Sequence, residues 1–469
     1  MKKLKLLLYL SLLLCAFSNA RAADISQRID SLMNALSQRG QFSGSILVAV
    51  GGKVIYRNGF GEADREAHIP FRPNTVSCIG SLAKQFTSMA IMLLAEQDKL
   101  QFDDPVTKYV PEINTFAEGI TIRHLLTHTS GIPDVGDLGI DNPRLNNDLV
   151  IKTLQGYKAN VAKMFMAPGL KYRYSNTGYM LLDVITERLS GQNRDDFMLQ
   201  QVFHPLQMAD TFVWVGKSSN PKNAALGYTP YGDLNRGVTG GVYSTVDDLF
   251  KWENALSTEK LVHKATLDIA YTPYPVKEGT STYGFGWNIT AKDGNQFIWH
   301  TGNTGTYRAF IGRMLPERIA VIMLTNKGIS KRMEINEAIV NMIHKKPYEM
   351  PKISIAEHLD MLIKQEGIDK AIEKYQSYQT NDTKNYDFAE SELNSLGYEL
   401  MSKRKGKEAI RIFELNTIAY PTSSNAFDSL AEAYYNIGNK ELAIKYYKKA
   451  LELDPKNLSS LGMLKKLKP

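Results

Sequence analysis

A serine and a lysine three positions apart could supply a nucleophile and its base. In Ser81-Leu82-Ala83-Lys84 a helical backbone would place both side chains on one face, within reach of each other. A serine hydroxyl is a weak nucleophile until a base removes its proton, and a lysine can do so only where burial lowers its pKa from about 10.4. Backbone N–H groups at the same turn could donate to the oxyanion of a tetrahedral intermediate. The pair therefore predicts acyl transfer, provided that it is buried.

The residues around Ser81 distinguish this pair from others with the same spacing. Three further pairs share it: Ser219/Lys222, Ser257/Lys260 and Ser402/Lys405. The apolar residues that follow Ser81 recur at helical intervals, at Leu82, Phe86, Met89 and Leu93. Such a stripe predicts a helix buried in the core, with Ser81 at its first turn. None of the other three pairs begins such a segment.

A second polar group, Tyr174-Ser175-Asn176, lies between the turn residues Pro168-Gly169 and a helix-like run over residues 178–189. A tyrosine near a lysine ammonium titrates more easily and can pass a proton to a leaving group. Asn176 could hold either the substrate's carbonyl group or the lysine. Taken alone, the motif is explained as well by a packed aromatic at Tyr174 and a helix cap at Asn176.

A third group, His300-Thr301-Gly302, lies on a strand that begins near Phe297. A glycine at that place permits close backbone approach by a substrate lying along a strand edge. Without the other two groups, the histidine would be interpreted as an ordinary turn residue.

The elements that must position these residues mix strands and helices from residue 24 to residue 346. Strand-like runs are predicted over residues 45–50, 53–56, 297–300, 307–314 and 319–324. Gly51-Gly52 separates the first two and predicts a hairpin. Helical patterns fill the middle, so that strands at both ends and helices between them predict an α+β fold.

A repeat of 34 residues follows in the last part of the chain. The matching positions are Leu396/Leu430, Gly397/Ala431, Ala409/Ala443, Phe413/Tyr447 and Pro421/Pro455. This is the period of the tetratricopeptide repeat, so residues 385–469 are predicted to form paired helices. Asn416 departs from the pattern where a small alanine is usual, and Leu400 where an aromatic is usual. The repeats predict either a stabilising cap or a groove that binds a protein partner.

Residues 347–384, which begin at Pro347, interrupt the mixed pattern and predict a linker. Ala371 and Tyr375 within it suggest a degenerate copy of the repeat. The hydrolase unit is accordingly expected over residues 23–346.

The first 22 residues predict a secretory signal peptide. Basic residues at the start precede an apolar run over residues 6–17 and the small residues of Ala20-Arg21-Ala22. The run is shorter than the roughly 20 residues that a membrane helix needs. A lipoprotein anchored at Cys15 is disfavoured because Leu14 is bulky. We expect a periplasmic or secreted protein without an integral membrane segment once the signal is removed.

Composition excludes several classes of protein. The 469 residues exceed one typical domain. The formal charge of +7 includes four basic residues of the signal, which leaves 52 basic against 49 acidic residues and argues against nucleic-acid binding. Cys78 is the only cysteine after the signal, so no intrachain disulfide is expected. The absence of a G-x-S-x-G motif argues against an α/β-hydrolase.

Neither a metal nor a cofactor is expected. His124 and His128 have the four-residue spacing of zinc ligands on a helix. Leu125, however, stands where a zinc protease carries its glutamate, and no third ligand is evident. Glycine-rich phosphate-binding loops are absent as well.

The order and spacing of the three groups resemble the active-site motifs of the serine β-lactamase and D,D-peptidase superfamily, in its class C and esterase-like branch. Further matching stretches are Asp103-Asp104-Pro105, residues 122–131, Gly178-Tyr179, Pro205-Leu206, Gly240-Gly241 and residues 283–287. The resemblance covers about residues 30 to 345. It implies an antiparallel sheet flanked by helices, with an all-helical lobe and the active site between them.

The resemblance also implies roles for single residues. Ser81 would be acylated, Lys84 and Tyr174 would share the base and acid roles, and Asn176 would orient substrate and lysine. The backbone N–H groups of Ser81 and Asn303 would form the oxyanion hole, and water would then release the acyl group.

His300 departs from the β-lactamases of this branch, which usually place a lysine there. With an unperturbed pKa of about 6.5 a histidine is largely uncharged near pH 7, so a permanent cation for a substrate carboxylate is missing. Arg308, eight residues on, could restore a charge. We therefore expect an ester or a peptide-like amide as substrate, as in an esterase, D-aminopeptidase or D,D-carboxypeptidase. A class C-type β-lactamase, and an inactive envelope protein whose repeats recruit a partner, are the alternatives.

Overall fold

The computed structural model describes residues 23–113, 117–134, 147–155, 166–214, 221–235, 240–292, 294–327 and 331–467. The chain forms two compact units, Met1–Glu349 and Met350–Pro469. The predicted signal peptide over residues 1–22 lies outside the described residues, and so does Ser219. The first described residues, 23–38, form a helix.

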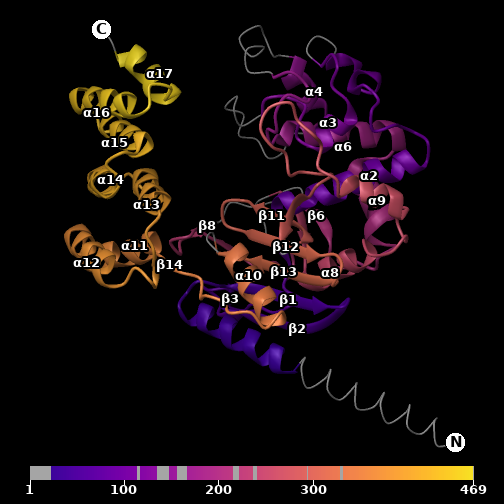
Figure 1. The fold of residues 1–469 in the computed structure, drawn as a ribbon, viewed down its shortest axis with the longest axis horizontal. Helices are drawn as coiled ribbons and strands as arrows, with labels where there is room; N and C mark the ends of the chain where they lie inside the picture. The colour runs from indigo at the N-terminus through magenta and orange to yellow at the C-terminus, as the bar shows by residue number, and fades with distance from the viewer. Residues whose placement is uncertain are drawn as a thin grey trace, which may run out of the picture. The chain divides into compact units, whose positions relative to one another are not determined.

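A six-stranded antiparallel sheet is the centre of the first unit (Figure 1). Its strands, in spatial order, are β10 (Asn288–Lys292), β11 (Asn295–Asn303), β12 (Arg308–Met314), β13 (Ile319–Thr325), β1 (Gly44–Val50) and β2 (Lys53–Phe60). The turn between β1 and β2 contains Gly51 and Gly52, both at positive φ, a conformation that glycine adopts without steric cost. β1 pairs with β13, with Leu47 opposite Ile322. All five predicted strand runs are confirmed.

Both faces of the sheet are buried at its central strands β12, β13 and β1. Alternate side chains on one face join the main core together with helix α8 (Val246–Ala255); they include Leu47, Ile311 and Ile322. The side chains next to them along the strands point the other way and are buried as well, among them Ile46, Phe310 and Val321. Helix α10 (Arg332–Ile343) lies on this second face, where its Asn336 approaches Gly312. The predicted antiparallel sheet flanked by helices is confirmed.

The middle of the chain forms the helical lobe. Its elements are α2 (Lys84–Glu96), α3 (Ile122–Leu126), α4 (Asn147–Gln155), α6 (Asn176–Ser190), α7 (Arg194–Met198) and the π-helical turn η5 (Leu199–Phe203). Helix α2 runs through the core, with Phe86 and Met89 buried and Leu93 partly buried, as its apolar stripe predicts. Helix α6 packs against both α2 and α3. The helical run predicted over residues 178–189 and the all-helical lobe are confirmed.

Short elements complete the first unit. They are β3 (Glu62–Asp64), β4 (Ile69–Pro70), β5 (Ser77–Cys78), η1 (Gly80–Ala83), η2 (Val106–Lys108), η3 (Pro111–Ile113), β6 (Phe212–Trp214), β7 (Gly227–Tyr228), β8 (Leu234–Asn235), β9 (Gly241–Ser244) and α9 (Lys264–Ala270). Strands β5, β9 and β6 form a three-stranded sheet with β9 in the middle. This sheet matters for the site, because β5 leads directly into η1.

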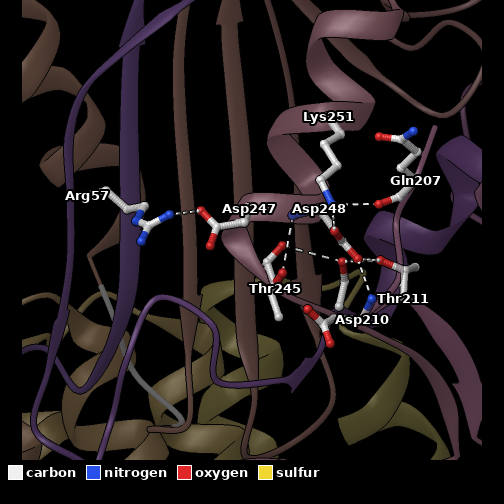
Figure 2. A network of polar contacts seen from close by, with 9 residues as sticks. Arg57, Gln207, Asp210, Thr211, Thr245, Asp247, Asp248 and Lys251 are labelled. Carbon is white, nitrogen blue, oxygen red and sulfur yellow. Dashed lines mark hydrogen bonds and ion pairs between the residues drawn. The ribbon is translucent and has the colours of Figure 1, made fainter.

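A buried carboxylate connects the start of α8 to the segment that leads into β6 (Figure 2). The Asp248 carboxylate accepts hydrogen bonds from the backbone N–H of Asp210 at 2.8 Å and from the Thr211 hydroxyl at 3.0 Å. It also pairs with Lys251 at 2.7 Å. Thr245 caps the helix by accepting the backbone N–H of Asp248. One side chain therefore fixes the start of α8 relative to the segment before β6.

The second unit consists of helices in antiparallel pairs. They are α11 (Ile355–Glu366), α12 (Ile368–Asn381), α13 (Glu390–Ser402), α14 (Gly406–Ala419), α15 (Ser424–Asn436), α16 (Lys440–Leu453) and α17 (Leu458–Leu467), with short strands β14 (Ile353–Ser354) and β15 (Tyr386–Asp387). Gly397 of α13 leaves room for the ring of Phe413 on α14. Ala371 and Tyr375 of α12 are buried. Much of the segment expected as a linker over residues 347–384 is therefore helical.

The two departures from the repeat pattern have different settings. Leu400 is buried and fills the place of an aromatic residue. Asn416 is also fully buried, and its side-chain amide has no hydrogen-bond partner within the described residues. Leaving such a group unpaired costs about 1–3 kcal/mol, so Asn416 weakens the packing of α14.

Within the part of the chain that the structure describes, no helix combines the length and the apolar character needed to cross a membrane.

Candidate active site

The Ser81 and Lys84 side chains meet where η1 passes into α2. The Lys84 Nζ donates to the Ser81 Oγ at 3.3 Å and to the Asn176 Oδ1 at 2.7 Å. Lys84 is 8% exposed, and burial lowers the pKa of its amine to about 8, against a smaller opposing effect of the Asp134 carboxylate. The lysine can therefore lose its proton near neutral pH, which is the property that a base for Ser81 requires.

Asn176 is positioned by the first turn of α6. The Ser175 hydroxyl caps this helix by accepting the backbone N–H of Gly178. The backbone N–H of Asn176 donates to the Asp134 carboxylate. The cap predicted for this motif is thus provided by Ser175, while the Asn176 side chain accepts a hydrogen bond from Lys84, one of the two roles considered for it.

Tyr174 lies on the other side of the lysine. Its phenol is close enough to Ser81 for the serine to oppose the rise in the phenol's pKa, and the Lys84 Nζ lies 4.8 Å from the centre of its ring. The expectation that the lysine makes this tyrosine easier to ionise is wrong, because burial raises the pKa of Tyr174 to about 12. A neutral phenol can donate a proton or a hydrogen bond near neutral pH, but it is a poor base.

His300 is buried and has partners on both ring nitrogens. Its Nδ1 lies 2.6 Å from the Thr301 carbonyl oxygen, which can only accept, so that Nδ1 carries the proton. The Nε2 then accepts from the Tyr283 hydroxyl at 2.8 Å. Burial lowers the pKa of His300 to about 3. The prediction that this histidine is uncharged near pH 7 is confirmed.

The end of β11 packs against the segment that carries the serine. A Cβ on Gly302 would collide with the Ile79 carbonyl oxygen, so this glycine permits the close approach of the protein's own chain. The approach of a substrate along this strand, which the sequence predicts, is a separate matter and stays a prediction. A Cβ on Gly80 would lie 2.9 Å from the backbone nitrogen of Asn303, which brings the backbone beside Ser81 close to that of Asn303.

The free edge of β11 begins at His300. Strand β10 pairs with β11 only as far as Trp299, whereas β12 continues to Asn303. One strand edge of residues 300–303, which include the partly exposed Thr301, therefore has no partner among the strands that the structure describes. The Asn303 side-chain oxygen accepts from Arg332 at 2.9 Å. Arg308 donates to the carbonyl oxygens of Gly305 and Tyr307 in the adjacent turn.

A cavity of about 1000 Å³ contains Ser81, Lys84, Asn176 and Asn303 in its wall. One side of the wall is acidic, with Asp183, Glu187, Asp195 and Asp196. Arg194 is the cation among them and pairs with Asp183 at 2.8 Å and with Asp195 at 2.6 Å. The described wall thus has four carboxylates against the two basic side chains of Arg194 and Lys84, and this balance disfavours a negatively charged ligand.

His124 and His128 do not form a metal site. Helix α3 ends at Leu126, and His128 has a φ of 57°, so the two histidines do not share a helical face. The His124 ring accepts the backbone N–H of Thr121 and lies 3.1 Å from the Tyr274 hydroxyl. Among the residues with described positions, no cluster of histidine, cysteine, aspartate and glutamate could hold a metal ion.

Several residues that contact the site received no role in the sequence analysis. Asp134 binds the backbone of Asn176, Tyr283 binds His300, and His128 contacts Tyr174. All three lie in or beside the family-like stretches over residues 122–131 and 283–287. Their positions in those stretches were the only available signal, because their partners are distant in the sequence.

Comparison with known proteins agrees with this architecture. A sequence profile described as Beta-lactamase matches residues 25–341, and one described as Tetratricopeptide repeat matches residues 429–457. Penicillin-binding protein 4* of Bacillus subtilis (strain 168) is 31% identical over 360 residues, which cover 70% of this chain and 78% of that protein.

Two solved structures extend the comparison. The octameric penicillin-binding protein homologue from Pyrococcus abyssi is 30% identical, with a TM-score of 0.60 over 68% of this chain and 77% of that one. The D-amino acid amidase from Ochrobactrum anthropi SV3 is 22% identical, with a TM-score of 0.59 over 69% of this chain and 99% of that one. The second likeness is one of fold.

Proposed function

The chain belongs to the beta-lactamase family, and we propose that it is an exported serine hydrolase that cleaves an ester or a peptide-like amide through an acyl group on Ser81. The observation that carries the proposal is the contact between the Ser81 Oγ and a buried Lys84 amine, in the wall of a cavity large enough for a small substrate. Burial gives the lysine the pKa of about 8 that a base near neutral pH needs.

The proposed reaction proceeds in two half-reactions. In the first, Lys84 takes the proton of Ser81 while the Oγ attacks the substrate's carbonyl carbon. The backbone N–H groups of Ser81 and Asn303 bind the oxyanion of the tetrahedral intermediate. Tyr174, as a neutral phenol, donates its proton to the leaving group and recovers one from Lys84. In the second half-reaction, water attacks the acyl carbon and gives a proton to Lys84. The bond between the acyl carbon and the Ser81 Oγ then breaks, the acid leaves, and Lys84 returns the proton to Ser81.

The charges around the site support the preference for an ester or amide without a carboxylate. His300 is neutral and turned toward Tyr283, so it cannot pair with a substrate carboxylate. Arg308 directs its guanidinium to the carbonyl oxygens of its own turn. The acidic side of the wall adds repulsion for an anionic substrate. The names of a penicillin-binding relative and of a D-amino acid amidase with the same fold agree with peptide-like chemistry.

The second unit supports a role in binding a protein partner. Its tetratricopeptide profile matches residues 429–457, and repeats of this kind form extended binding surfaces. Export is proposed from the sequence of residues 1–22, and the penicillin-binding relative is consistent with a place in the cell envelope. Ser81, Lys84, Tyr174 and Asn176 are all present and in contact, which favours an enzyme over an inactive binding module.

Two chromogenic substrates test the proposal directly. Purified protein without residues 1–22 is expected to hydrolyse a short-chain nitrophenyl ester, with kcat reduced at least about 10³-fold in Ser81→Ala. Nitrocefin should be hydrolysed poorly. Efficient hydrolysis of nitrocefin without turnover of the ester would instead favour the class C-type β-lactamase, and no turnover of either would favour the binding module.

A further inference from the structure

His128 is a buried histidine beside the site that the proposed reaction does not use. It follows α3, is 1% exposed and has a φ of 57°, a left-handed conformation that few residues other than glycine adopt. Such a conformation costs of order 1 kcal/mol and persists only where the surroundings enforce it. Its contacts identify those surroundings as the segment that carries Tyr174.

His128 binds the backbone on both sides of Tyr174. Its carbonyl oxygen accepts the N–H of Arg173 at 2.8 Å. Its ring Nδ1 accepts the N–H of Ser175 at 3.1 Å. One residue therefore binds the N–H of the residue before the tyrosine and the N–H of the residue after it, and these two bonds restrict the direction in which the tyrosine side chain leaves the backbone.

The His128 ring also packs on the tyrosine itself. The ring centres of His128 and Tyr174 are 4.2 Å apart, with an angle of 36° between the planes. Tyr283 and Tyr179 contact the same imidazole at 4.5 Å and 4.9 Å between ring centres. The Lys84 amine lies on Tyr174 as well, 4.8 Å from the ring centre. The phenol is thus held by its ring as well as by its backbone.

The hydrogen bonds of the imidazole indicate which of its atoms matters. Because Nδ1 accepts the Ser175 N–H, the neutral ring carries its proton on Nε2. This Nε2 is buried and has no hydrogen-bond partner within the described residues. A phenylalanine would fill the same space without burying an unpaired N–H. What the imidazole adds is therefore the acceptor for Ser175.

We propose that His128 is a positioning residue for Tyr174: it holds the phenol beside Ser81 by binding the Ser175 N–H and stacking on the ring. This inference rests on the proposed function, since it assigns Tyr174 a part in acyl transfer. The imidazole remains neutral, because burial and the nearby Lys84 hold the pKa of His128 well below its usual range. It is not among the described residues in the wall of the cavity, and it acts through the tyrosine.

Two substitutions separate the acceptor from the ring. His128→Phe keeps an aromatic ring but leaves the Ser175 N–H unpaired. His128→Asn loses the ring, retains a side-chain oxygen as acceptor and tolerates positive φ better than most residues. Since a displacement of about 1 Å can cost about 100-fold in rate, we expect His128→Phe to lower kcat on a nitrophenyl ester about 10- to 100-fold. KM should change less than about twofold, and His128→Asn should lose less kcat than His128→Phe.

The matched control is His124→Asn. His124 lies four residues before His128 in the same stretch, but its ring contacts Thr121 and Tyr274. This variant should keep the kcat of the unmodified protein.

The decisive measurement is a double-mutant cycle between His128→Phe and Tyr174→Phe in the full chain. A residue that acts through Tyr174 loses its effect once the phenol is absent, so His128→Phe should cost less than about twofold in the Tyr174→Phe background. A loss of the same size in both backgrounds would reduce His128 to a general packing role. If His128→Phe does not fold, as judged by circular dichroism, the same cycle with His128→Asn gives the same two outcomes. An unmodified protein without esterase activity would overturn the proposed function itself, whereas an active protein with additive losses overturns only the assignment of His128.

Discussion

Lys84 carries its amine in surroundings that disfavour a charge. The difference between an ordinary lysine pKa of 10.5 and about 8 corresponds to about 3 kcal/mol of lost stabilisation of the ammonium. Burial accounts for this loss, and the charges of Asp134 and Asp183 offset part of it. The fold therefore destabilises the charged form of Lys84, and the result is an amine that can accept a proton beside Ser81.

The pH dependence of kcat/KM should report this amine. Protonated Lys84 cannot act as a base, so activity should be low in acid and rise with pH through about 8, then level off. The Tyr174 phenol, with a pKa of about 12, stays neutral across this range. Initial rates at substrate concentrations far below KM, between pH 5 and pH 10, measure the profile.

Asp134→Asn provides a directional check of the same assignment. The Asp134 carboxylate raises the pKa of Lys84, so its removal should move the rising limb to lower pH. The asparagine oxygen can still accept the backbone N–H of Asn176, which limits any other effect. A rising limb near pH 6 in the unmodified protein would mean that another group titrates. So would a limb that stays at the same pH in Asp134→Asn.

At the scale of single residues, the sequence predicted which residues form the site better than it predicted how deeply each one is buried. Ser81, Lys84 and Asn176 meet as their motifs indicated. The start of a helix places Ser81 and Lys84, three positions apart, on one face, and the capped first turn of α6 places Asn176 beside them. The direction of the Tyr174 pKa was wrong, since burial outweighs the nearby ammonium. Burial depends on which distant segments pack around a residue, and those segments are not visible in a local motif.

Individual elements show the same division between local and distant signals. Strands β1, β12 and β13 are long apolar runs bounded by turn residues, and each was predicted within a few positions. The sheet β5-β9-β6 was not predicted, because its strands have only two to four residues. Pairing with a distant partner, and not propensity, makes these residues extended.

The two acidic residues in the first turn of α8 offer a matched comparison of element stability. Asp248 is buried and serves three partners, whereas Asp247 forms an exposed pair with Arg57 at 2.9 Å (Figure 2). Asp248→Ala should lower the free energy of unfolding by about 3 kcal/mol, since it leaves buried donors unpaired. Asp247→Ala should cost less than about 1 kcal/mol. Urea unfolding followed by fluorescence measures both, and equal losses would contradict the role given to Asp248.

At the scale of the molecule, the chain consists of two units with separate cores. Every described residue in the wall of the cavity belongs to the first unit, between Cys78 and Thr304. The second unit contributes packed helices with the repeat spacing that the sequence contains. The 34-residue period was sufficient to predict these helices, because each repeat packs mainly on its neighbours. The helical character of residues 355–381 was less evident, since their copy of the repeat is degenerate.

Removal of the second unit should leave the chemistry intact. A chain that ends at Glu349 retains the whole sheet, the helical lobe and the cavity. We expect its kcat/KM on a nitrophenyl ester to lie within about twofold of that of the longer chain. Steady-state kinetics on both chains test this, with circular dichroism as a check of folding. A loss of more than about tenfold in a folded chain would show that the repeats take part in catalysis.

The central claim is that Ser81 is acylated, and intact-protein mass spectrometry tests it most directly. After incubation with a fluorophosphonate, the unmodified protein should gain the mass of one adduct, which peptide mapping should assign to Ser81. Ser81→Ala should gain none, and Lys84→Met should react at least about 100-fold more slowly because the base is absent. An adduct on another residue would contradict the account. So would the absence of any adduct on the protein without substitutions while Ser81 is accessible.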